Sequence, residues 1–338
     1  MNANRWIPAL GLLAFLTLVA MVWPHVRPML EPRGGETVYV VLKTTGPQME
    51  FWQIVRAGLQ AAALEYDVEP VIVGPQWEKD VDHQIEILAE VIERNPRGIL
   101  LAASDFNRLV PLAEQAAARG ITIVTLDSAL NSDVPVSFVA TDNVSAGMKA
   151  GREIQRLVPT HRPVALVSHI EGVATAIERE EGVRTALANR DPRLILGTFY
   201  SQNEPDIAYA IVLELVERYP DLGGIVAMNE SSTVGAGRAL RDLGIADRVH
   251  LVGFDNSREE IEFLQQGIVK ALVVQRPFNM GYLGIRTLVQ AIRRQPVDPV
   301  IHTDAVLVRR DDMFTEENQK LLFPIVQGRY AEQSSFAE

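Results

Sequence analysis

Short apolar runs alternate with longer segments of helical periodicity along most of this chain, and this alternation constrains its fold more than any other feature. Val81, Ile85, Leu88 and Ile92, for example, recur at spacings of four, three and four, which places them on one helix face. Alternating strands and helices are typical of parallel sheets built from βα units. The strands predicted in the first series cover residues 38–42, 68–73, 99–102, 121–126 and 136–140.

A second series of the same kind begins after residues 141–143. Because 338 residues exceed what one compact core normally holds, the two series are interpreted as two domains of an α/β protein. Ser231 or Ser232 is the expected N-cap of the helix at 231–243. The predicted strands of this series cover residues 164–167, 194–199, 225–228, 251–255, 270–275 and 305–308. The other predicted helices cover residues 50–66, 109–119, 144–157, 177–188, 205–219, 258–266 and 280–293.

Composition and missing motifs exclude several classes of function. A net charge of −11 argues against nucleic acid as a partner, because phosphates bind clusters of Lys and Arg. The chain has no cysteine, no P-loop and no Gly-x-Ser-x-Gly elbow, and its six histidines do not stand at metal-ligand spacing. We therefore predict no enzymatic activity, no cofactor and no metal site. The short Gly235-Ala236-Gly237 motif is interpreted as helix packing.

The amino-terminal residues 1–35 predict a membrane segment followed by a linker. Ile7–Trp23 carries no charge and as a helix would be about 25 Å long, near the lower limit for spanning a bilayer. A retained anchor is favoured over a cleaved signal peptide, because Leu18 fits poorly in the small-x-small rule for cleavage after Ala20. Prolines and glycines after residue 23 indicate a non-helical tether to an extracytoplasmic body.

Polar residues stand where several predicted strands end. Asp255 follows the apolar run 251–254 of the second series. In the first series, Asp127 follows the predicted strand 121–126, and Lys43 follows the predicted strand 38–42. In doubly wound sheets, ligands bind just beyond the carboxyl ends of strands. Lys43 could therefore hold a ligand hydroxyl or pair with Asp127, while Asp127 is also compatible with a turn residue.

Other candidates each have a plain structural alternative. Phe51 and Trp52 could offer an aromatic face to a sugar ring or pack under a loop. Arg179 could be a solvated helix charge, Asn229 a helix N-cap and Gln275 a crossover residue without a ligand. Taken together, side chains that donate and accept hydrogen bonds beside an aromatic wall favour a neutral, hydroxyl-rich ligand.

The order of these motifs from Val38 to Leu322 resembles the type I periplasmic binding protein superfamily, close to its ribose-binding-protein-like sugar receptors. Each motif is weak alone, and their ordered set is specific. The segments that carry the resemblance are Phe51-Trp52 with Gly58, 123–127, 140–143, 178–182, 227–230, 252–255 and 274–277.

The resemblance implies two doubly wound, Rossmann-like parallel-sheet lobes joined by a three-stranded hinge, with the ligand clamped between them. The first lobe would comprise residues 36–141 plus 277–303, the second 142–276 plus 304–325, and 326–338 would be a tail. The hinge crossovers would lie near residues 141–142, 275–276 and 303–304. The ligand contacts that the resemblance implies are Phe51, Trp52, Asp127, Arg179, Asn229, Asp255 and Gln275.

The chain departs from the ribose receptors at several of these positions. Lys43 replaces a small polar residue, Ser128 replaces an arginine, and Gln202 or Asn203 stands near the place of an aromatic residue in the second lobe. We expect a pentose or hexose, with an autoinducer-2-like furanosyl ligand as the alternative, since Lys43 with Asp127-Ser128 resembles the first lobe of those receptors.

The resemblance implies an extracytoplasmic protein that closes around a monosaccharide by hinge motion. Its membrane partner would be a sensor histidine kinase of a two-component system or an ABC permease, and a membrane anchor favours the kinase modestly. The ligand domain of a transcription factor is a distant alternative, because an apolar run stands where the DNA-binding helices would be. A hydrolase on a similar scaffold lacks a recognisable nucleophile and base.

Overall fold

The structure is a computed structural model, and it describes residues 36–323. The predicted membrane segment Ile7–Trp23, its linker and the carboxyl-terminal tail lie outside this range. Within the described part of the chain, no helix is both long and apolar enough to cross a bilayer.

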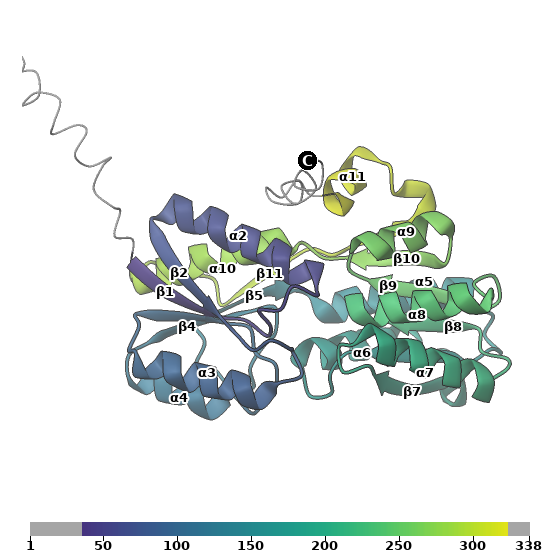
Figure 1. Cartoon of the computed structure of the whole chain (residues 1–338), viewed down its shortest axis with the longest axis horizontal. Helices are drawn as coiled ribbons and strands as arrows, with labels where there is room; N and C mark the ends of the chain where they lie inside the picture. The colour runs from purple at the N-terminus through teal and green to yellow at the C-terminus, as the bar shows by residue number, and fades with distance from the viewer. Residues whose placement is uncertain (1–35, 324–338) are drawn as a thin grey trace, which may run out of the picture.

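The described chain forms two six-stranded sheets, each in its own lobe (Figure 1). The first sheet is parallel throughout, with strand order β11-β5-β4-β3-β1-β2. The second has the order β12-β10-β9-β8-β6-β7 and is parallel except for its edge strand β12. The prediction of two parallel-sheet α/β lobes is therefore confirmed. The first-sheet strands are β1 (Glu36–Val41), β2 (Val68–Val73), β3 (Gly98–Leu101), β4 (Thr122–Leu126), β5 (Ser137–Thr141) and β11 (Val300–Thr303). Those of the second sheet are β6 (Val164–Ser168), β7 (Ile195–Tyr200), β8 (Gly224–Ala227), β9 (His250–Phe254), β10 (Val269–Val274) and β12 (Val306–Arg309).

Helices cover both faces of each sheet, so every central strand is buried on two sides. In the first lobe, α2 and α10 cover one face, and α3 and α4 cover the other (Figure 1). In the second lobe, α5 and α6 lie opposite α7, α8 and α9. The helices are α2 (Glu50–Tyr66), α3 (Val81–Glu93), α4 (Val110–Ala118), α5 (Asn143–Leu157), α6 (Ala174–Ala186), α7 (Pro205–Arg218), α8 (Glu230–Leu243), α9 (Arg258–Gln266), α10 (Pro277–Ile292) and α11 (Glu316–Leu322), with short 3₁₀ turns at Pro192–Leu194 and Arg310–Asp312.

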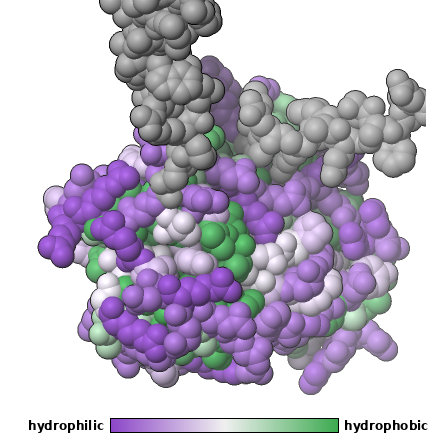
Figure 2. Space-filling model, turned by 60° about the vertical axis from the view of Figure 1, so that its left-hand side comes forward, coloured by the Kyte–Doolittle hydropathy of each residue, from purple (hydrophilic) through white to green (hydrophobic). Residues whose placement is uncertain are grey.

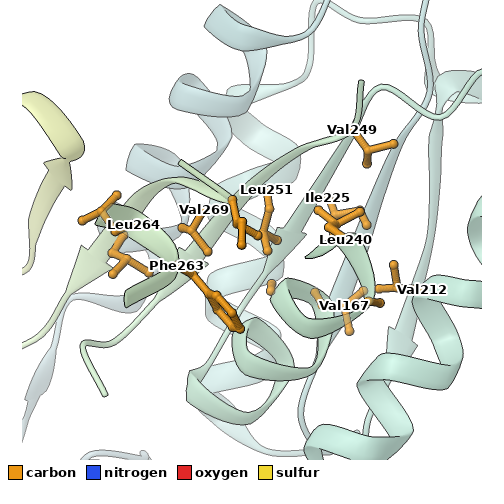
Figure 3. Close-up of a cluster of buried hydrophobic side chains, with 14 of the residues drawn as sticks. Val167, Val212, Ile225, Leu240, Val249, Leu251, Phe263, Leu264 and Val269 are labelled. Atoms are coloured by element: carbon orange, nitrogen blue, oxygen red, sulfur yellow. The ribbon is translucent and has the colours of Figure 1, made fainter. Parts of the chain in front are cut away.

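The largest apolar cluster lies under α7, α8 and α9 in the second lobe. The cluster joins Phe263 of α9 and Leu240 of α8 to the strand residues Ile225 and Leu251, and Figure 3 shows Leu240 beside Ile225. Burying side chains of this size stabilises the lobe by about 2 kcal/mol each. The surface is mostly hydrophilic. In Figure 2, hydrophilic residues cover most of the visible face, and hydrophobic residues gather mainly in its middle.

The chain passes between the lobes at three places. β5 of the first sheet runs into α5 of the second lobe, β10 of the second sheet runs into α10 of the first, and β11 runs into β12. Connections between two lobes are where hinge motion is usually absorbed.

Several local predictions differ from the structure. Asn229 is the N-cap of α8, so the expectation of Ser231 or Ser232 is wrong; the Asn229 carboxamide accepts a hydrogen bond from the Ser232 N–H at 3.1 Å. β11 was not predicted, because this short edge strand exposes Val300 and His302 and has no continuous apolar run. The packing role of Gly235 is confirmed, since a Cβ there would collide with the Pro205 carbonyl oxygen.

Candidate functional site

A small cavity of about 30 Å³ lies between the lobes, beyond the carboxyl ends of strands from both sheets. Space of this size holds a few water molecules at most, so a larger ligand fits only where the two lobes stand further apart. The cavity is lined by Lys43, Met49, Phe51, Trp52, Glu78, Asp127, His169, Thr175, Arg179, Asn229, Asp255 and Gln275.

The first lobe contributes a buried charge cluster. The Lys43 Nζ lies 2.8 Å from Asp127 Oδ2 and 3.5 Å from Glu78 Oε1, and all three side chains are almost fully buried. Burial raises the pKa of Glu78, and the positive charge of Lys43 opposes that rise. Ser128 donates a hydrogen bond to Asp127 Oδ2 at 3.3 Å and lies behind the cavity wall. Of the two roles considered for Lys43, the ion pair with Asp127 is therefore formed.

Phe51 and Trp52 form an aromatic wall at the start of α2. Their ring centroids are 5.1 Å apart and their planes nearly perpendicular, at 88°. Both rings are buried and both line the cavity, so each ring packs against the protein and also faces the cavity. Edge-to-face pairs of this kind hold each ring in one orientation.

Arg179 of α6 is the main positive group of the second lobe. Only 3% of its surface is exposed, so the alternative of a solvated helix charge is wrong. Its Nε donates to Asn143 Oδ1 at 2.9 Å, its Nη1 donates to the Met228 carbonyl at 2.8 Å, and its guanidinium lies 4.8 Å from the centre of the Phe254 ring. These contacts fix the guanidinium at the cavity wall.

Asp255 is held by two donors at the end of β9. Its Oδ2 accepts from the Glu230 N–H at 2.9 Å, and its Oδ1 accepts from Gln275 Nε2 at 2.6 Å. Gln275 in turn accepts from Thr141 Oγ1 at 2.9 Å, which links two crossover segments to the cavity. Burial raises the pKa of Asp255, and Arg179 opposes this. Asp127 and Asp255 both have left-handed backbones, with φ of 63° and 77°, a costly conformation that recurs at functional sites.

Asn229, Asn203 and Gln202 lie toward the outer side of the cleft. Asn229 Nδ2 donates to Asn203 Oδ1 at 2.7 Å, and Asn203 Nδ2 donates across the cleft to Glu78 Oε2 at 2.8 Å. Asn229 thus serves both as an N-cap and as part of the wall. Gln202 and Asn203 line a separate outer pocket of about 470 Å³ that includes the half-exposed Trp77. The structure therefore brings eight of the eleven predicted ligand residues to the inner cavity and leaves Ser128, Gln202 and Asn203 outside its wall.

Sequence reasoning missed three polar residues of the wall: Glu78, His169 and Thr175. A signal existed for His169, which follows β6 directly, as Asp127 follows β4. Glu78 stands in a loop after β2, where no pattern distinguishes it from other exposed carboxylates. Among residues 36–323, no group of His, Cys, Asp or Glu side chains is arranged to hold a metal ion.

Glu230 joins the lobes through the beginning of α2. Met49, the N-cap of that helix, provides no side-chain hydrogen bond. The Glu230 carboxylate of the other lobe accepts instead from the Glu50 and Phe51 N–H groups, each at 3.1 Å. Burial and the neighbouring Asp255 raise the pKa of Glu230 to about 8. Closure thus supplies the missing cap of α2 and buries a carboxyl group that then holds its proton more tightly.

This burial predicts that ligand affinity falls as pH rises. In the open protein the pKa of Glu230 returns toward its ordinary value near 4.5, so closure takes up a proton between about pH 4.5 and 8. The stabilisation of the closed form is complete below this window and is lost by its upper end, with a slope of up to about tenfold per pH unit. Burial also raises the pKa values of the neighbouring Asp255 and Glu260, and the negative charge of Glu50 adds to the rise in the pKa of Glu230.

Calorimetric titrations from pH 5 to 8.5 check this prediction. Glu230→Gln is expected to flatten the slope, whereas Glu217→Gln on the exposed side of α7 should leave it unchanged. An equal slope in wild type and Glu230→Gln would contradict the assignment.

Two parallel-sheet lobes with a polar and aromatic cavity between their strand ends define a two-lobed solute-binding protein. The family model of the periplasmic binding protein domain matches residues 38–296, and the chain belongs to this family. It is 25% identical over 319 residues to the D-ribose/D-allose-binding protein of Pseudomonas aeruginosa, spanning 90% of this chain and 98% of that relative.

Solved structures agree with this assignment. A sugar transporter from Clostridium phytofermentans matches with a TM-score of 0.76 and 32% identity, covering 81% of this chain and 99% of that one. An ABC transporter solute-binding protein from Agrobacterium vitis with bound D-fucose matches with a TM-score of 0.81 and 30% identity, covering 85% and 100%.

Proposed function

We propose that this protein is an extracytoplasmic sugar-binding protein that closes around one monosaccharide. The observation that carries the proposal is the mixed chemistry of the inner cavity. Carboxylates, amides and a guanidinium from both lobes surround it beside two aromatic rings. Vicinal hydroxyls donate and accept at once, so they can satisfy such a set of groups, and a sugar ring can lie on the aromatic wall.

The ligand is proposed to be a pentose or hexose. Relatives whose names specify D-ribose, D-allose or D-fucose support this class. Lys43 paired with Asp127 supports an autoinducer-2-like furanosyl ligand as the second candidate, because Lys43 with Asp127-Ser128 resembles the first lobe of autoinducer-2 receptors. The proposed contacts are Lys43, Phe51, Trp52, Asp127, Arg179, Asn229, Asp255 and Gln275.

The partner is proposed to be a membrane protein that recognises the closed form. Relatives described as ABC transporter components support a permease. The uncharged stretch Ile7–Trp23 supports a tethered receptor, and a tether suits a sensor histidine kinase of a two-component system. Deleting the gene separates these partners: loss of radiolabelled sugar uptake indicates the permease, and loss of sugar-induced transcription with normal uptake indicates the kinase.

Calorimetry with D-ribose, D-allose, D-arabinose, D-fucose and an autoinducer-2 preparation tests the binding proposal. At least one of these ligands is expected to bind with a Kd of about 1 μM or tighter. Asp255→Ala should weaken that binding at least tenfold, since Gln275 and the Glu230 N–H lose their acceptor. The exposed Asp191→Ala is the matched control. An absence of heat with every pentose, hexose and furanosyl ligand would refute the proposal.

A further inference from the structure

His169 is a polar residue of the cavity wall that has an incomplete set of partners. It follows the last residue of β6, and only 3% of its surface is exposed. Its ring Nε2 lies 2.9 Å from the Thr175 hydroxyl, which fixes the ring plane. Its Nδ1 is buried and has no hydrogen-bond partner among the described residues.

This unpartnered nitrogen differs from the other buried unpartnered groups. Ser104, Ser168 and Thr287, for example, also have buried hydroxyls without partners, but none of them lines the inner cavity. Among the described residues, His169 alone combines an unpartnered buried side-chain atom with a place in that wall. Because an unsatisfied buried polar atom is costly, the cavity is the natural source of its missing partner.

The charge state of His169 restricts what that partner can be. Burial, together with the positive charges of Lys43 and Arg179, lowers the pKa of the imidazole well below 6.5, so the ring is neutral at pH 7. In one tautomer the Nδ1 of a neutral ring donates, and in the other it accepts. A hydroxyl group can satisfy either form. A positively charged ammonium group at the same point would be repelled by Lys43 and Arg179, the same charges that disfavour protonation of the ring.

We propose that His169 forms a hydrogen bond through Nδ1 to one hydroxyl of the bound sugar, and that it selects against ligands in which this hydroxyl is missing or replaced by an amine. Thr175 acts as the positioning residue for the ring. The inference rests on the proposed sugar-binding function and adds one specificity-determining contact from the second lobe. It predicts that a single hydroxyl position of the sugar is coupled to this side chain.

A thermodynamic cycle with sugar analogues tests this contact. The probe is whichever of D-ribose, D-allose and D-fucose binds wild type most tightly, with its complete set of monodeoxy and monoamino analogues. His169→Ala is expected to weaken binding of the parent sugar by about tenfold. For one monodeoxy analogue, wild type and His169→Ala should bind equally well, and the amino analogue at the same position should be the weakest wild-type ligand of the amino series.

A matched control and a second variant keep the test decisive. His250 also has a buried, unpartnered Nδ1, but it lies at the other end of the second sheet, where β9 begins. His250→Ala should bind every analogue as wild type does. If His169→Ala does not fold, His169→Gln is measured in the same cycle and should retain part of the discrimination.

Two results would overturn the contact while leaving sugar binding intact: equal loss of affinity for all analogues, or no loss for any. If wild type binds no pentose, hexose or furanosyl ligand, the proposed function fails and this inference fails with it.

Discussion

Lys43→Met is expected to weaken sugar binding by about 100-fold or more. Asp127 and Glu78 both depend on the Lys43 ammonium, and each is almost fully buried once the lobes close. Removing one partner of a buried ion pair costs about 3 kcal/mol or more, which corresponds to over 100-fold in affinity. Because Lys43, Asp127 and Glu78 belong to one lobe and face the cleft, we expect water to hydrate the two carboxylates when the lobes stand apart. The cost therefore falls on closure more than on folding.

A second substitution tests whether the effect of Lys43→Met comes from the buried ion pair. Asp127→Asn removes one of the two carboxylate charges left without Lys43, so the double variant Lys43→Met with Asp127→Asn should bind more tightly than Lys43→Met alone. Lys79→Met is the control, because its ion pair with Glu204 is largely exposed and is worth less than about 1 kcal/mol. Calorimetry measures the affinity for the sugar, and denaturant unfolding measures the free energy of unfolding. A double variant no better than Lys43→Met would mean that the lysine acts through some contact other than this pair.

Gly147→Leu is expected to lower the free energy of unfolding by about 3 kcal/mol and to abolish sugar binding. The reason is the close approach of α5 to α6, where a Cβ on Gly147 would collide with the backbone of Arg179. Overpacking of this kind typically costs 1–3 kcal/mol, and here the obstacle is backbone that cannot rotate away. The helix must shift, and the guanidinium of Arg179 moves with it away from Asn143 and Met228.

Gly197→Ala provides the matched control for this substitution. Gly197 lies in the edge strand β7, and an added Cβ there meets no atom within 4 Å. Thermal unfolding should show a Tm lower by roughly 5–10 °C for Gly147→Leu and nearly unchanged for Gly197→Ala. Normal binding by a stable Gly147→Leu protein would show that the site does not depend on this helix contact.

The pattern of apolar runs and helical spacings predicted the two-lobed α/β architecture, because neighbouring residues decide where each strand and helix forms. Apolar runs such as residues 251–254 are buried strands, and the polar residue that follows each run marks the edge where the two lobes face each other. The short strand β11 was missed, since its four residues contain no continuous apolar run and two of them are exposed. Ser231 or Ser232 and Asn229 were all candidate caps of this helix, and Asn229 occupies the position.

Parts of the site that depend on the other lobe could not be predicted from pattern. Glu230 reads as an ordinary first-turn carboxylate of α8, and only the folded chain shows that it binds the beginning of α2, about 180 positions away. Glu78 likewise gains part of its role from Asn203 of the other lobe. Such pairings depend on how the lobes meet, and no spacing along the chain encodes that.

Gln275 belongs to a crossover and to the cavity wall at the same time, since it bonds both Thr141 and Asp255. We therefore expect ligand selectivity and lobe closure to depend on one side chain. A substitution that adapts this position to a different sugar will also alter how often the unliganded protein samples its closed form. The apparent affinity for every ligand scales with that population, so variants at Gln275 should gain or lose tightness for all sugars together before they discriminate among them.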